Sequence, residues 1–383
     1  MNEHVASLWP PPAVVRRERF PRGEGSHYLA VPSVRGPRLL IPNDVRGADR
    51  MLVRHGGARR TRLARAMLRA AHRCGLSSWM PVSRLVVSPE PSGIEAHVTR
   101  VMGRPVRLGV LLGPPRANIK PVLQLFDVDG RTVAFAKVAT STISASLLDA
   151  EAAALRRLER RPVPGVLAPQ LVDISAWRDR LVLVQTALPA AQSSRQPTIL
   201  PTAALAAIAA SGGIRRSTLD ASAFWHTVRD VGPSHWHGLD VSAFAHLRDA
   251  IDPAVECSFG AWHGDFAPWN AACGEHHLEV WDWERFEEEV PAGLDAAHWR
   301  AQVDVWADPA ATWSAMCHDA EQVISALGTP SSGAVTAACY LLNVWMRYRH
   351  DAAEFVTPDL RARTAWLCDV ARAALPDMKE TRP

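Results

Sequence analysis

The 383-residue sequence is poor in lysine: of its 43 basic residues, only Lys120, Lys137 and Lys379 are lysines. Its six cysteines include no CxxC pair and no short His/Cys spacing, which argues against a disulfide framework and against structural zinc. It also lacks a run of about 18 apolar residues and a basic leader before an apolar stretch, so we expect neither a membrane span nor a signal peptide. These absences favour a reducing, cytoplasmic setting.

Arginine is abundant instead, and the charge is divided by region. Residues 1–73 hold fifteen Arg against five Asp or Glu, although the whole chain has a formal charge of only +4. A helical pattern over Ala58–Cys74 places arginines on one side and apolar residues on another. Because this helix has no aromatic residue for base stacking, a helix docked on the body with a solvated arginine face is favoured over a nucleic-acid or membrane contact.

The length and the 48% hydrophobic content allow one large core or two to three smaller ones, so we expect a bilobal or extended enzyme. Near the N-terminus, His27–Pro32 and Arg38–Pro42 suggest a small hairpin. A short strand at Leu85–Ser88 and a short helix at Ile94–Met102 follow. The chain then changes to a period-two pattern.

Three antiparallel strands are predicted from alternation over Val106–Leu112, an apolar run over Val122–Phe126, and RTVAFAKVA after an Asp-Gly turn. Lys137 lies in this third strand, in line with apolar neighbours. In the following helix, Ile143–Arg160, Glu151 interrupts an apolar stripe and therefore needs a cation or donors. Lys137 is the candidate partner. The alternative is that Glu151 faces water at the edge of the stripe and Lys137 extends from a strand end towards solvent.

The remaining chain has two further strands, Gln170–Ile174 and Arg180–Gln185, then a polar connector over 190–200. Beyond it the pattern is helical up to a central motif, and helical again after it. The predicted fold class is therefore α+β, with a β-rich lobe before a helical lobe. The predicted helices are Pro201–Ala210, Leu219–Val231, Val241–Ile251, Leu294–Ala307, Ala310–Ala326, Gly333–His350 and Pro358–Leu375.

The central motif, WHGDFAPWNAACGEHHLEVWDWE, runs from Trp262 to Glu284. The carboxylate of Asp265 can accept a proton from an attacking hydroxyl, and Asn270 can turn its amide oxygen towards a metal. Asp282 follows a short apolar run and supplies a second carboxylate. Three such side chains around one point are what magnesium-assisted phosphoryl transfer requires.

With its HGDxxxxN loop and downstream Asp282, the chain resembles the aminoglycoside phosphotransferase and choline kinase-like family, small-molecule relatives of the protein kinases. The resemblance covers about residues 100–375. It implies a bilobal protein kinase-like fold with an N-terminal extension, and ATP and Mg²⁺ as cofactors. Residues 1–100 would be an extension whose role the sequence does not identify, 101–189 an antiparallel-sheet N-lobe that clamps the nucleotide, and 190–383 a helical C-lobe with the catalytic loop and substrate pocket.

The resemblance also implies roles for individual residues. Asp265 would be the catalytic base, and Asn270 and Asp282 the magnesium ligands. Lys137 would bind the α- and β-phosphates of ATP, with Glu151 as its ion-pair partner.

Two further parts of the nucleotide site follow from the resemblance, together with a structural histidine. His263 would hold the catalytic loop in shape. The phosphate-covering loop should lie at Gly113–Lys120, although GPPRANIK has a single glycine and nothing like GxGxxG. Lys120 is a rival phosphate ligand, but its turn position beside Pro121 more often indicates solvent exposure. The hinge whose backbone meets the adenine would comprise Gln185, Thr186, Ala187 and Leu188.

The acidic run Glu284, Glu287, Glu288 and Glu289 follows the metal-binding strand. It predicts an acceptor with positive charge, and a solvated helix start is an equal alternative. We therefore expect an ATP- and Mg²⁺-dependent phosphotransferase acting on a hydroxyl of a small molecule, such as an aminoglycoside, an amino alcohol or a sugar-like compound. A protein or peptide kinase, and a nucleotide-binding regulatory module without catalysis, are the alternatives; the oligomeric state stays open.

Overall fold

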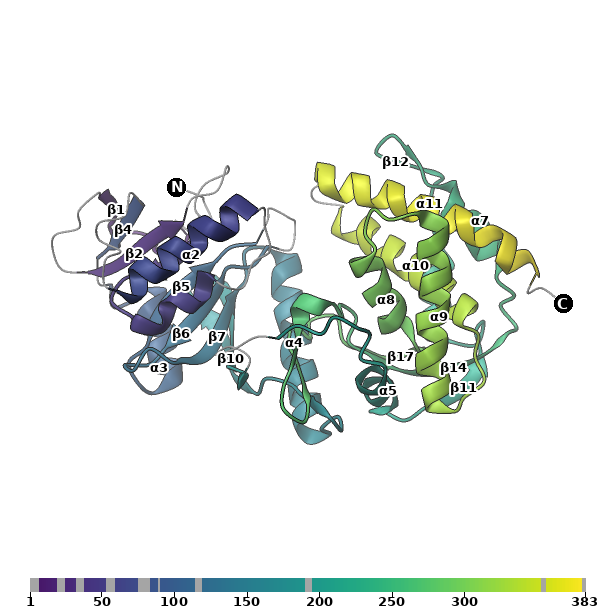
Figure 1. The fold of residues 1–383 in the computed structure, drawn as a ribbon, viewed down its shortest axis with the longest axis horizontal. Coiled ribbons are helices and arrows are strands. Elements are labelled where there is room, and N and C mark those ends of the chain that lie inside the picture. The colour runs from purple at the N-terminus through teal and green to yellow at the C-terminus, as the bar shows by residue number, and fades with distance from the viewer. Residues whose placement is uncertain are drawn as a thin grey trace. The chain divides into compact units, whose positions relative to one another are not determined.

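The chain folds into two compact units in the computed structural model (Figure 1). The amino-terminal unit comprises Met1–Ala152 and Pro169–Ser194, and the carboxy-terminal unit comprises Ala153–Ala168 and Arg195–Pro383. The first is built on an antiparallel sheet and the second is mainly helical, which confirms the predicted α+β fold. The structure describes residues 7–18, 25–31, 38–52, 59–74, 83–88, 90–113, 119–189, 195–352 and 356–380.

In the described part of the amino-terminal unit, nine strands form one sheet in the order β1-β4-β2-β3-β5-β6-β7-β10-β9. The three strands predicted from alternation are β5, β6 and β7, and they pair antiparallel in sequence order. The strands are β1 Val15–Glu18, β2 Ser26–Val31, β3 Leu39–Pro42, β4 Ser83–Val87, β5 Arg107–Leu111, β6 Val122–Phe126, β7 Thr132–Val138, β9 Leu171–Trp177 and β10 Arg180–Thr186.

Strands from the first hundred residues extend this sheet. The predicted hairpin is present as β2 and β3, and β3 continues the sheet by pairing Leu39 with Leu111 of β5. Its turn, residues 32–37, lies outside the described residues. The predicted domain boundaries at residues 100 and 189 stay a prediction, but the N-terminal strands share one sheet with the strand that carries Lys137.

Within the described residues, the sheet is accompanied by the helical segments η1 (Arg46–Leu52), α2 (Arg59–Arg73), α3 (Ile94–Met102) and α4 (Thr142–Arg160). The predicted basic helix is α2. Two of its arginines, Arg69 and Arg73, place Nε 2.8 and 2.9 Å from Oδ2 of Asp49, which is only 2% exposed. The helix is therefore docked on the body, as the favoured interpretation expected, but Arg69 and Arg73 of the face that was expected to be solvated pair with buried Asp49.

The carboxy-terminal unit confirms the predicted helices and adds strands that the sequence did not reveal (Figure 1). The segment before the motif is not wholly helical, because β11 and β14 pair antiparallel there. All of β14 but its first residue is buried, so the strand shows no polar alternation that would mark it in the sequence. The strands of this unit are β8 Val166–Leu167, β11 Arg215–Thr218, β12 His235–Trp236, β13 Leu239–Asp240, β14 Glu256–Trp262, β15 Ala271–Cys273, β16 Leu278–Val280 and β17 Glu287–Pro291.

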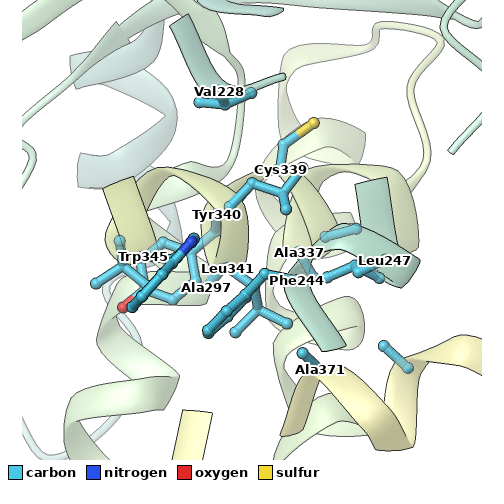
Figure 2. Close-up of a cluster of buried hydrophobic side chains, with 14 of the residues drawn as sticks. Val228, Phe244, Leu247, Ala297, Ala337, Cys339, Tyr340, Leu341, Trp345 and Ala371 are labelled. Atoms are coloured by element: carbon cyan, nitrogen blue, oxygen red, sulfur yellow. The ribbon is translucent and has the colours of Figure 1, made fainter. Parts of the chain in front are cut away.

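The helices of this unit pack around a large apolar core, part of which Figure 2 shows. Phe244 of α7 stacks on Trp345 of α10, with ring centroids 4.9 Å apart and planes inclined by 6°. Among the described helices, none is both long enough and apolar enough to cross a bilayer. The helices are α5 Thr202–Ala210, α6 Ala223–Val228, α7 Ser242–Ala250, η4 Pro268–Asn270, α8 Leu294–Val303, α9 Pro309–Leu327, α10 Gly333–Asp351 and α11 Pro358–Glu380.

Candidate active site

Lys137 of β7 and Glu151 of α4, the charged residues within otherwise apolar patterns, form an ion pair in the amino-terminal unit. Nζ of Lys137 lies 2.7 Å from both carboxylate oxygens of Glu151. The two side chains are 7% and 0% exposed, respectively. A carboxylate so deeply buried requires a cation or several donors, and the lysine supplies the cation. The ion pair expected from the sequence is present, and the alternative in which Glu151 faces water is wrong.

The predicted hinge lies at the end of β10. The Thr186 N–H donates to the carbonyl of Gln170 at 2.9 Å, and the Ala187 N–H donates to the carbonyl of Val133 at 3.1 Å. An adenine contact would therefore fall to other backbone groups between Gln185 and Leu188. Within the predicted phosphate-covering loop, residues 114–118 lie outside the described residues.

Strand β14 leads into the predicted catalytic loop, in the carboxy-terminal unit. His263 follows the strand directly and is fully buried. Its Nδ1 accepts the N–H of Asp265 at 3.2 Å, so Nε2 carries the proton and donates to the carbonyl of Trp281 at 3.1 Å. Burial lowers the pKa of His263 to about 4 despite the opposing charge of Asp265, so the ring is neutral at physiological pH. His263 thus ties the loop to the end of β16.

Gly264 adopts a backbone conformation that only glycine tolerates well, with φ at +83°. A Cβ at this position would lie 2.0 Å from the carbonyl oxygen of Arg285. We expect Gly264→Ala to destabilise the protein by about 2 kcal/mol or more, because either the loop or the backbone at Arg285 must move.

Urea unfolding will measure the loss caused by Gly264→Ala. Gly328→Ala is the matched control, since Gly328 also has a positive φ but has nothing within 4 Å of the added carbon. Equal losses in the two variants would contradict a steric role for the contact with Arg285.

The carboxylate of Asp265 is fixed from two sides. Nδ2 of Asn270 donates to its Oδ2 at 3.1 Å and to its backbone carbonyl at 2.9 Å. Nε2 of His298 lies 3.2 Å from its Oδ1. Burial raises the pKa of Asp265, but the hydrogen bond and charge of His298 and the charge of Arg347 outweigh that effect and hold it well below its usual range. With its side chain 39% exposed, Asp265 is an ionised carboxylate within reach of a ligand.

A short hairpin brings Asn270 and Asp282 to the same end of a sheet. Ala271 of β15 pairs with Val280 of β16, and the Trp281 N–H donates to the carbonyl of Asn270 at 3.1 Å. Asp282 comes next and has a φ of +73°, in the left-handed region that costs a non-glycine residue about 1–3 kcal/mol. Such strain is concentrated at functional sites. An amide oxygen and a carboxylate are the hard ligands that Mg²⁺ prefers, so this donor set fits the metal.

Sequence reasoning missed three residues that surround this loop. Asp295 of α8 accepts the N–H of His263 at 2.6 Å and that of Gly264 at 3.0 Å. His298 of the same helix faces Asp265, and Arg347 of α10 donates to the carbonyl of Gly264 at 2.8 Å. The spacing of three between Asp295 and His298, in a helix buried almost throughout, was the available signal.

The ionisation of Asp295 makes the free energy of unfolding depend on pH. Burial raises its pKa to about 7, against the opposing effect of the two backbone N–H groups. Since its ordinary pKa is 3.8, the native state binds the extra proton between these values, and the contribution of Asp295 to stability falls as pH rises from about 4 to about 7. We expect Asp295→Asn to remove that part of the pH dependence of the unfolding free energy.

The measurement for Asp295→Asn is urea unfolding at half-unit pH steps. The variant should also lose about 1–3 kcal/mol at low pH, because one backbone N–H is left without its acceptor. If wild type and variant show the same slope between pH 4 and 7, the titration belongs to another group.

Glu287, Glu288 and Glu289 of the acidic run lie in β17, and Glu284 precedes this strand, so the alternative that these residues begin a helix is wrong. The three glutamates of β17 are exposed. Glu288 pairs with Arg157 at 2.9 Å and Glu289 with Arg215 at 3.4 Å. The roles of Glu284, Glu287 and Glu288 as acceptor ligands stay a prediction.

A comparison with protein-family models and one with curated proteins returned no match. Among solved structures, the chain is similar to an apo thermostable mutant of aminoglycoside phosphotransferase APH(4)-Ia (13% identity, 74% of this chain and 99% of that chain covered, TM-score 0.48). It is also similar to amicoumacin kinase hAmiN in complex with AMP-PNP, Ca²⁺ and Ami (14% identity, 76% of this chain and 95% of that chain covered, TM-score 0.44). A third similar structure is that of a choline/ethanolamine kinase family protein from Mesorhizobium loti (14% identity, 72% of this chain and 92% of that chain covered, TM-score 0.45). The chain thus resembles, at low identity, structures of the aminoglycoside phosphotransferase and choline kinase-like family that its sequence motif indicates.

Proposed function

We propose that this protein is a kinase that moves the γ-phosphate of ATP to a hydroxyl group of a small molecule, with Mg²⁺ as its metal. The observation that carries the proposal is the catalytic loop. An ionised carboxylate, Asp265, is fixed there by the amide of Asn270, and Asp282 directly follows Trp281, whose N–H donates to the Asn270 carbonyl. Such an arrangement suits phosphoryl transfer, in which the protein contributes mainly positioning and electrostatic stabilisation.

In this proposal Asp265 orients the acceptor hydroxyl and takes its proton as the phosphate is transferred. Asn270 and Asp282 would hold Mg²⁺, which when bound neutralises charge on the phosphates. Because Nδ2 of Asn270 faces Asp265, the amide oxygen is directed elsewhere and can serve the metal. Lys137 would bind the α- and β-phosphates, with Glu151 holding its ammonium group in place. The segment Gln185–Leu188 would meet the adenine.

The test is purified protein with ATP, Mg²⁺ and a panel of hydroxylated metabolites, followed by mass spectrometry of the products. A product heavier by one phosphate, formed only with both ATP and Mg²⁺, is expected. Stabilisation by MgATP without transfer to any acceptor would favour a nucleotide-binding regulatory module instead. Phosphate recovered on serine or threonine of added peptides would favour a protein kinase.

A further inference from the structure

Around Asp265, three helices of the carboxy-terminal unit present polar side chains. Oη of Tyr340, on α10, lies 3.2 Å from Nδ1 of His298, on α8. One turn further along α8, Oε1 of Gln302 accepts a hydrogen bond from Nη2 of Arg363, on α11. Tyr340, His298 and Gln302 are buried, so an acceptor that brings its hydroxyl to Asp265 would reach this region through the partly exposed groups beside them.

Two guanidinium groups belong to this region, those of Arg347 and Arg363. Burial raises the pKa values of Tyr340 and Tyr348, the charges of both arginines oppose the rise, and the charge of Asp265 adds to it. The charges of Arg347, Arg363 and Asp265 therefore all influence the pKa values of the same two tyrosine hydroxyls. Arg347 and Arg363 are both partly exposed residues, although Nε of Arg363 is buried.

Neither arginine has a carboxylate partner within 4 Å in the described part of the chain. Arg347 donates to the Gly264 carbonyl and lies over the Trp262 ring at 5.3 Å, which leaves most of its five N–H donors for other groups. Nε of Arg363 is buried and makes no hydrogen bond within the described residues. Two other arginines of this unit do have carboxylate partners: Arg157 pairs with Glu288, and Arg300 pairs with Asp319.

We propose that the acceptor carries an anionic group, a carboxylate or a phosphate, which Arg347 and Arg363 bind while its hydroxyl faces Asp265. Planar guanidinium groups match both anions with paired, charge-assisted hydrogen bonds. Of the three exposed glutamates of β17, Glu288 and Glu289 are engaged by Arg157 and Arg215. This inference rests on the proposed phosphotransferase function, because it assigns Asp265 to the acceptor.

Four six-carbon probes that differ in charge test the inference: sorbitol, glucosamine, gluconate and glucose 6-phosphate. Each is added to the full-length protein with Mg²⁺ and saturating AMP-PNP, and binding is followed by saturation-transfer NMR. We expect gluconate or glucose 6-phosphate to bind in preference to the other two, and the stronger of them identifies the anion. Arg363→Gln should weaken that binding about tenfold or more, the effect of losing a charge-assisted contact.

Arg372→Gln is the control, because Arg372 lies on the same helix, is exposed and pairs with Asp369 at 2.6 Å. It should leave anion binding unchanged. The inference is overturned if sorbitol or glucosamine binds as well as the anions, if no probe binds, or if Arg363→Gln and Arg372→Gln behave alike. Transfer of phosphate from ATP to glucosamine would uphold the proposed function and refute an anionic acceptor. A different result would be that Arg363→Gln loses anion binding while wild type phosphorylates none of the hydroxylated metabolites. That result would uphold the arginine site and count against the proposed phosphotransferase function.

Discussion

Asp265→Asn is expected to lower the rate of phosphoryl transfer by about 10²–10⁴-fold, the usual contribution of a positioned general base. The substitution keeps the size of the side chain but removes the ionised carboxylate that can take the hydroxyl proton. An amide oxygen can still accept the hydrogen bond from Nδ2 of Asn270, which now reaches Oδ2 at 3.1 Å. The loop should therefore keep its shape while its chemistry is lost.

Three measurements separate this loss of chemistry from a loss of structure. Initial rates are taken with the acceptor that the metabolite panel identifies, stability is followed by urea unfolding, and nucleotide binding by the thermal shift that MgATP produces. Asp252→Asn is a suitable control, because Asp252 receives the Ala254 N–H at 3.0 Å in a turn, and asparagine can receive it too. Turnover of Asp265→Asn within tenfold of wild type would contradict the assignment of the base.

The elements that the sequence revealed are those whose burial is one-sided and periodic. Strand β7 has a residue pattern in which a lone lysine stands out, and helix α4 has a stripe in which a lone glutamate stands out. Since the elements are consecutive, local reasoning was enough to pair Lys137 with Glu151. The same holds for Asp265 and Asn270, which are five residues apart in one loop.

What the sequence could not reveal depends on packing between distant elements. Strand β14 is buried on both faces, so it carries no alternation and is not distinguished from other apolar stretches. His298 and Arg347 reach the loop around Asp265 from helices that begin at Leu294 and Gly333, and no local spacing predicts such contacts. The acidic run was conspicuous as a sequence pattern, but its partners Arg157 and Arg215 also come from distant segments.

The Lys137–Glu151 pair allows stability and nucleotide binding to be separated. Lys137→Met should destabilise the protein by about 3–5 kcal/mol, because it leaves the carboxylate of Glu151, which is 0% exposed, without its cation. The double variant Lys137→Met/Glu151→Leu replaces both charges with apolar groups of similar volume. It should recover most of that stability, since such replacements of buried ion pairs are often neutral.

If Lys137 binds the phosphates of ATP, the double variant will stay defective in nucleotide binding although its fold is restored. Urea unfolding measures the first effect, and titration of the stable double variant with MgATP measures the second. Lys379→Met, at the exposed C-terminal end of α11, is the control for removing a lysine. If the double variant binds MgATP as tightly as wild type, the Lys137–Glu151 pair has only a structural role. The phosphates of ATP would then be bound by another cationic residue. A double variant as unstable as Lys137→Met would instead mean that this site cannot accommodate an apolar pair. The comparison would then be repeated with Lys137→Met/Glu151→Gln, in which the glutamine is a neutral side chain that can still form hydrogen bonds.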